Sequence, residues 1–132
     1  MRRRLLVIAS TSLVLSACRD SDSGLPREYR DISIPVTLRS AETIERGREL
    51  FGRYCTLCHG MRGDGRGLQR EGLQPPPQDF TDATWRADTS PRRVFAVIRE
   101  GQPQTAMPSW KSLSEQDAWD LTAYVLSLSA SR

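Results

Sequence analysis

The stretch Cys55-Thr56-Leu57-Cys58-His59 decides how the rest of this chain is interpreted. Two cysteines three residues apart, followed at once by a histidine, are typical of covalent c-type haem attachment. In that arrangement each thiol adds to a vinyl group of the haem, and the imidazole becomes an axial ligand of the iron. The pattern therefore predicts Cys55 and Cys58 as thioether attachment points and His59 as an iron ligand.

Cysteines at this spacing also occur in redox dithiols and in zinc sites. A redox dithiol would need a βαβ context, and a structural zinc site would need a second pair of ligands. The only other cysteine is Cys18 and His59 is the sole histidine, so a four-ligand zinc site could be completed only with carboxylates. Haem attachment is favoured, with a disulfide, a redox dithiol and a metal site as the alternatives.

The charge balance depends on which part of the chain is counted. The 132 residues, which fit one domain plus a targeting segment, carry a formal net charge of +3. Three of the 19 basic residues precede Cys18, whereas all 16 acidic residues follow it, so the rest of the chain has 16 of each. A balanced chain of this kind excludes nucleic-acid binding and polybasic lipid binding as functions.

Residues 1–18 predict a bacterial lipoprotein signal peptide. Arginines are followed by an apolar run that is too short to span a bilayer, which takes roughly 20 residues. The end of the run, Leu-Ser-Ala-Cys at 15–18, resembles a lipobox, in which the cysteine is acylated and becomes the new N-terminus. Cys18 is therefore the predicted lipidation site and membrane anchor; the alternative is an ordinary signal peptide cleaved near Ala17. We expect the domain to face the periplasm, with the inner membrane slightly favoured over the outer.

Residues 19–39 are polar, contain serine, glycine and proline, and show no amphipathic period. Such a composition predicts a flexible tether between the anchor and the domain. Within it Ile32, Ile34 and Val36 alternate, so they could lie along the domain as one short extended strand.

The remaining residues, 40–132, are predicted to form one all-α domain with three main helices. A helix capped by Ser40 should run into the Cys55 to His59 motif, and a short helix should occupy residues 91–100, closed by Gly101. A capping box that begins at Ser114 should open an amphipathic last helix.

Residues 40–130 resemble the class I, single-haem cytochrome c family. The residues that carry the resemblance are Gly47, Phe51, the motif at 55–59, Met107 and Tyr124. It implies a small all-α fold whose N- and C-terminal helices cross over one covalently bound haem c. Gly47 and Phe51 match the place where the first helix crosses the last at close range. The family also implies that a backbone carbonyl of Pro75, Pro76 or Pro77 accepts a hydrogen bond from the outer ring nitrogen of His59, which would orient the imidazole.

The sixth position of the iron separates an electron carrier from a ligand-binding haem. No second histidine is present, so a methionine is the natural candidate. Met1 leaves with the signal peptide, and Met61 is too close to His59 in sequence to reach the opposite face of the ring. Met107 remains, and Met107-Pro108 matches the family's distal ligand loop.

Together these features predict an electron carrier rather than an enzyme, with Cys55, Cys58, His59 and Met107 holding one haem c. Its partners would be redox proteins of the respiratory chain and, through Cys18, a membrane. One rival function is a cytochrome subunit of a larger membrane oxidoreductase. The other is a haem sensor or peroxidase-like enzyme in which Met107 dissociates.

Overall fold

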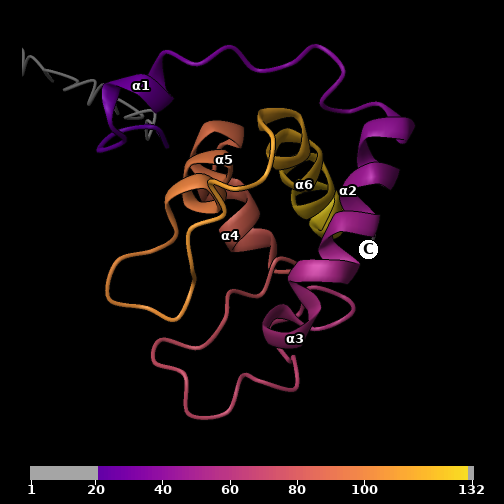
Figure 1. Ribbon diagram of the computed structural model, residues 1–132, viewed down its shortest axis with the longest axis vertical. Coiled ribbons are helices and arrows are strands. Elements are labelled where there is room, and N and C mark those ends of the chain that lie inside the picture. The colour runs from indigo at the N-terminus through magenta and orange to yellow at the C-terminus, as the bar shows by residue number, and fades with distance from the viewer. Residues whose placement is uncertain (1–20, 131–132) are drawn as a thin grey trace, which may run out of the picture.

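The structure is a computed structural model that describes residues 21–130 (Figure 1). The predicted signal peptide and Cys18 lie outside the described residues. The elements in order are α1 (Arg27–Arg30), α2 (Ala41–Tyr54), α3 (Thr56–His59), α4 (Ala83–Asp88), α5 (Pro91–Glu100), α6 (Glu115–Ser127) and the 3-10 turn η1 (Leu128–Ala130). Between residues 21 and 130 there is no strand, which confirms the all-α class. None of the described helices has the length and apolar character needed to cross a membrane.

The three predicted main helices begin at the expected caps. The hydroxyl oxygens of Ser40, Ser90 and Ser114 accept hydrogen bonds from the backbone N–H groups three residues later, at 3.2, 3.1 and 3.0 Å. Each cap satisfies a donor that the first turn of a helix leaves without a partner. The helix α5 ends as predicted at Gly101, whose φ of 73° is unfavourable for residues with a side chain.

The helices α2 and α6 cross at Gly47, as the family resemblance implied. A Cβ atom built on Gly47 would lie 2.0 Å from the carbonyl oxygen of Asp120 and 2.8 Å from the Cβ of Tyr124. One turn later the rings of Phe51 and Tyr124 pack with their centroids 5.2 Å apart. The missing side chain at position 47 therefore sets how closely the two helices approach.

A buried carboxylate lies beside this crossing. Asp120 on α6 is only 1% exposed, and Arg46 on α2 donates to both of its oxygens at 2.7 and 3.3 Å. Gln116 donates a third hydrogen bond at 2.8 Å. A buried charge is tolerated only when it is paired and hydrogen-bonded, so these contacts fix the register of α2 on α6.

The segment predicted to be a flexible tether contacts α5 between Ser21 and Ile32. We call residues 21–38 the N-terminal strap. Arg93 donates to the backbone carbonyls of Ser21 and Ser23 at 2.6 and 2.8 Å. Arg92 donates to the carbonyl of Ile32 at 3.0 Å. Tyr29 in α1 is 8% exposed and its hydroxyl donates to Glu100. The described part of this segment is therefore docked, and it forms no strand.

The short helices α1, α3 and α4 were not predicted. The helix α4 begins after Asp82, whose carboxylate accepts the backbone N–H of Thr84 at 2.8 Å. It places Trp85 against Phe80, with ring centroids 5.1 Å apart. Both aromatic side chains pack against the hydrophobic core, so this short helix covers one side of it.

Candidate haem-binding site

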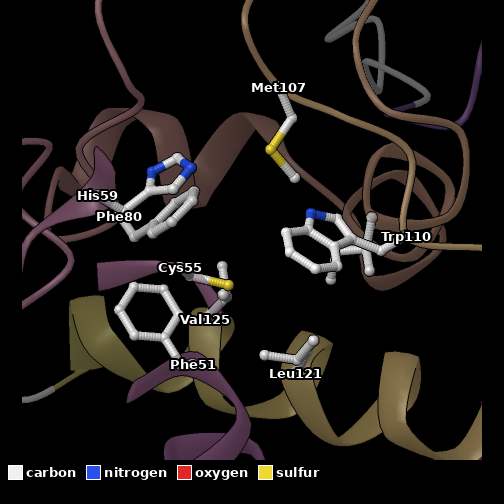
Figure 2. Close-up of a pocket in the computed structure, with 9 residues that line it drawn as sticks. Phe51, Cys55, His59, Phe80, Met107, Trp110, Leu121 and Val125 are labelled. Carbon is white, nitrogen blue, oxygen red and sulfur yellow. The ribbon is translucent and has the colours of Figure 1, made fainter. Parts of the chain in front are cut away.

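An apolar cavity opens where α2, α3, α5 and α6 meet the loop that precedes α6. Figure 2 shows it between the ring of His59 and the sulfur of Met107, above the side chains of α2 and α6. The complete lining is Phe51, Cys55, His59, Phe80, Ile98, Met107, Trp110, Leu121 and Val125. Three of the four residues predicted to hold the cofactor therefore face one space, although they come from segments far apart in the sequence.

The Cys55 to His59 motif forms the short turn that follows α2. Cys55 ends α2 by donating its backbone N–H to the carbonyl of Phe51 at 2.9 Å, and α3 follows at once. Cys58 lies in α3, half-buried and outside the cavity lining, while its carbonyl accepts the N–H of Gly67 at 3.0 Å. The turn keeps Cys55 and His59 at the same wall of the cavity.

Burial of the Cys55 thiol bears on the alternatives to haem attachment. Cys55 and Cys58 are both free, so they form no disulfide. Desolvation, with a smaller contribution from Cys58, raises the pKa of the Cys55 thiol to about 12. Redox dithiols and metal-ligating cysteines work as thiolates and have a lowered pKa. Cys55 is therefore suited to a neutral sulfur, as in a thiol or a thioether.

His59 is held by a backbone carbonyl, but by a different one from those expected. Its Nδ1 lies 3.2 Å from the carbonyl oxygen of Gln78. A carbonyl can only accept, so Nδ1 carries the proton and Nε2 keeps its lone pair. Burial lowers the pKa of His59 below its usual value, and the Gln78 contact partly opposes this. The ring is neutral and also stacks on Phe80, with centroids 4.6 Å apart.

The expectation that Pro75, Pro76 or Pro77 supplies this carbonyl is therefore corrected to Gln78, the residue after the three prolines. The loop after α3, which contains Gly63 and Gly65, explains the shift. The N–H of Phe80 donates to the carbonyl of Gly63 at 2.7 Å, and a Cβ on Gly65 would lie 2.5 Å from the carbonyl oxygen of Pro77. This close approach places residue 78, and not a proline, beside the imidazole.

Met107 reaches the cavity from the loop between α5 and α6. Its backbone N–H donates to the hydroxyl of Thr105 at 3.1 Å, and its carbonyl accepts the N–H of Gln102 at 3.1 Å. Figure 2 shows its sulfur pointing into the cavity from a different side than His59. Met61, in contrast, is 79% exposed and does not line the cavity. Trp110, which the sequence did not single out, completes the wall beside Met107.

The residues present fit a haem. The lining is aliphatic and aromatic apart from Cys55, the neutral imidazole of His59 and the thioether of Met107. An apolar enclosure with one histidine and one methionine is the environment in which His/Met-ligated haem is found. Cys55 and Cys58 supply the two sulfurs that covalent attachment needs.

Comparison with known proteins identifies the family. Residues 42–125 match the protein family described as cytochrome c oxidase, cbb3-type, subunit III. Cytochrome c55X of Stutzerimonas stutzeri is 34% identical over 90 residues, which cover 63% of this chain and 68% of that protein. The quinohemoprotein alcohol dehydrogenase ADH IIB of Pseudomonas putida is 30% identical over 129 residues, or 96% of this chain.

A solved structure shows the same fold. A chain in the reducing HAO-like protein complex of Kuenenia stuttgartiensis superposes with a TM-score of 0.61 at 30% identity, covering 74% of this chain and 49% of that one. This chain spans only 16% of the alcohol dehydrogenase. The matched residues contain the Cys55 to His59 motif, the crossing at Gly47 and Met107. The chain therefore belongs to the cytochrome c family and carries covalently bound haem c.

Proposed function

We propose that this chain is a class I, single-haem electron-transfer cytochrome in which His59 and Met107 are the axial ligands. The observation that carries the proposal is that both side chains face one apolar cavity from different segments. His59 is the only histidine in the sequence, and Met61 is turned to solvent. Cys55 and Cys58 are the proposed thioether positions.

Bound haem supplies one-electron chemistry, since its iron exists in ferrous and ferric forms. The surrounding residues bias that equilibrium. The thioether of Met107 is a soft ligand that stabilises the ferrous form, and the apolar lining disfavours the extra charge of the ferric form; both raise the potential. Gln78 orients His59 through Nδ1, which leaves Nε2 free to coordinate and increases its basicity.

We propose in addition that Cys18 is acylated and holds the domain on the periplasmic side of a membrane. The sequence Leu-Ser-Ala-Cys at 15–18 supports this, together with the apolar run before it. Acyl chains contribute about 0.8 kcal/mol per buried methylene, so several on one residue anchor a protein firmly. The inner membrane is slightly favoured, because the electron donors and acceptors of a respiratory chain are located there.

A second candidate is a cytochrome subunit of a larger oxidoreductase. Its support is that the similar region of the Pseudomonas putida protein is part of an alcohol dehydrogenase, and that the similar solved chain belongs to a protein complex. Co-purification with a catalytic subunit from native membranes would favour this function over a free carrier.

Replacing Met107 tests the proposed ligation. Met107→Ala should keep covalent haem, lose the weak far-red sulfur-to-iron absorption band, lower the potential and allow the reduced protein to bind carbon monoxide. Met61→Ala is the matched control, and its spectrum and its behaviour toward carbon monoxide should equal those of the wild type. An unchanged spectrum in Met107→Ala would contradict the proposal. Tight carbon monoxide binding by the wild type at neutral pH would instead favour a sensor or peroxidase-like function.

Membrane attachment is tested separately, by fractionation. The wild type should be found with the membranes, and Cys18→Ser should be found in the soluble periplasm with the same haem spectrum, because the anchor and the cavity share no side chain. A wild-type protein found entirely in the soluble fraction would mean that Cys18 is not acylated and that the signal peptide is cleaved as an ordinary one.

A further inference from the structure

The N-terminal strap leaves very little free chain between the proposed lipid anchor and the folded domain. Cys18 precedes Ser21, the first described residue, by three positions. Three residues span at most about 11 Å, even when they are fully extended. A flexible tether over all of residues 19–39 would instead have an r.m.s. length of about 25 Å. The point at which the strap first contacts the domain therefore determines where the anchor can lie.

That first contact is at the start of α5, and it begins with Ser21 itself. Arg93 donates to the carbonyl oxygen of Ser21 at 2.6 Å. The carboxylate of Asp22 accepts a hydrogen bond from the hydroxyl of Ser90 and another, at 3.4 Å, from Arg92. The side chains of Asp22 and Arg92 are only 20% and 30% exposed. A carboxylate is also stabilised beside the N-terminus of a helix, so the beginning of the strap is fixed to α5.

Burial extends this attachment along α5. Tyr29 in α1 is 8% exposed, and its ring packs against Phe95 of α5 with centroids 6.2 Å apart. Its hydroxyl donates to Glu100, in the last turn of the same helix. The strap is therefore attached at both ends of α5, and no single contact carries the attachment.

The strap and the haem-attachment motif lie at opposite ends of the molecule. Figure 1 shows α1 beside α5 at one end and α3 at the other. The loop after α3 stays at the same end as α3, because the N–H of Gln69 donates to the carbonyl of Leu57 at 2.8 Å. An anchor within three residues of Ser21 is thus held near α1 and α5, and far from α3.

We propose that the docked strap fixes the orientation of this domain on the membrane, with α1 and the start of α5 toward the lipid and α3 toward the aqueous phase. The proposal rests on the proposed acylation of Cys18. The acyl chains enter the bilayer within about 11 Å of Ser21, so the end of the domain that binds Ser21 stays at the headgroups. The Cys55 to His59 motif is then held away from the membrane surface.

The face turned toward the lipid would not bind it without the anchor. The exposed residues of α1 and its C-cap are two arginines and two acids: Arg27, Glu28, Arg30 and Asp31. Clustered basic residues attract anionic lipid, and a face with balanced charge gives no such attraction. The orientation therefore depends on the anchor together with the strap, and the Cys18→Ser form should not sediment with phosphatidylglycerol vesicles.

The experiment measures how far two labels lie from the membrane. The full-length, acylated haem protein is placed in phosphatidylcholine vesicles that contain a nickel-chelating lipid, with a spin label on Asp88→Cys or on Gln69→Cys. Both positions are exposed; Asp88 ends α4 just before the start of α5, and Gln69 lies beside α3. A domain of about 110 residues has a radius of gyration of about 13 Å, so its two ends are roughly 25 Å apart.

Lipid-bound nickel should relax the label at position 88 several-fold more strongly than the label at position 69. A soluble nickel chelate is the control for exposure, and it should relax the two labels about equally. Asp88 is 70 positions beyond Cys18. Its label is therefore kept near the membrane only if the strap is docked.

Two insertions of the same length separate a docked strap from a free tether. About fifteen Gly-Ser residues have an r.m.s. length of roughly 22 Å. Placed between Asp20 and Ser21, they should abolish the difference between the labels and leave the haem spectrum unchanged. Placed between Arg39 and Ser40, they lengthen the covalent path from the anchor to α2 equally but leave the contacts with α5 in place, so the difference should remain.

Three results would overturn the proposal. Equal relaxation of the two labels in a membrane-bound wild type would mean that the domain has no fixed orientation, and the proposed acylation would stand. Loss of the difference with both insertions would show that the strap is not docked on the membrane. A wild type that does not associate with the vesicles would remove the acylation of Cys18 and the orientation together.

Discussion

The cavity and the N-terminal strap both depend on the packing of the helices, but they are formed by different kinds of contact. The cavity is made by side chains such as Phe51, Leu121 and Val125, which pack from two crossing helices. The strap is held partly by the burial of Tyr29 and Leu38 and partly through its own backbone, because Arg92 and Arg93 bind its carbonyl oxygens. Every residue type has a backbone carbonyl. A segment bound in this way needs no characteristic pattern, which explains why the strap looked like a flexible tether in the sequence.

The largest effect is expected where the cavity depends on the helix crossing. Gly47→Ala places a Cβ atom 2.0 Å from the carbonyl oxygen of Asp120 on α6, so the two helices must move apart. Overpacking of this kind costs about 3 kcal/mol of unfolding free energy. Denaturant unfolding of the haem protein measures this loss of unfolding free energy.

Gly52→Ala is the matched control on the same helix. Nothing lies within 4 Å of a Cβ at position 52, so replacing a helical glycine should stabilise the protein by about 0.5–1 kcal/mol. Equal effects of the two substitutions would mean that the close approach of α2 and α6 is not formed in solution.

A smaller and local effect is expected in the strap. Arg93→Gln removes the charged donor for two carbonyls, and hydrogen bonds to charged groups contribute about 1.5–3 kcal/mol. Amide hydrogen exchange in residues 26–38 should then accelerate by about tenfold or more, while the haem spectrum stays the same. Arg27→Gln, which loses only an exposed ion pair with Asp31, should change neither quantity. Unaltered exchange in Arg93→Gln would contradict docking by the arginine.

The smallest expected effect is a change in the stability of the strap with pH. Burial, followed by the contact with Glu100, raises the pKa of Tyr29 from 10.0 to about 12. A raised folded-state pKa means that the stabilisation is complete below pH 10 and is lost as the pH rises toward 12. The contact of the strap with Glu100 should therefore weaken as the pH rises from 10 toward 12.

The titration of phenolate absorbance measures this shift. The difference between the wild type and Tyr29→Phe should show one tyrosine that ionises well above pH 10. A Tyr29 that ionises near its ordinary value would show that its contact with Glu100 is absent in solution.

Local rules were enough to predict a large part of the fold. A serine before an amphipathic run accepts a hydrogen bond three residues later whatever the rest of the chain does, and Ser40, Ser90 and Ser114 behave accordingly. The place of Gly47 at the helix crossing came from the family resemblance, and it is confirmed. The helix α4 was not predicted from its cap at Asp82, because it has only six residues and no clear apolar period.

The amino-acid sequence by itself determined the chemistry of the site, because the spacing of Cys55, Cys58 and His59 is local and the chain has no competing histidine. Only the tertiary structure decided which carbonyl orients His59, that Met107 faces the same cavity, and that the strap is docked. These features depend on contacts between residues far apart in the chain. Their geometry follows from how whole helices and loops pack, and backbone acceptors such as Gln78 carry no side-chain pattern that a sequence could reveal.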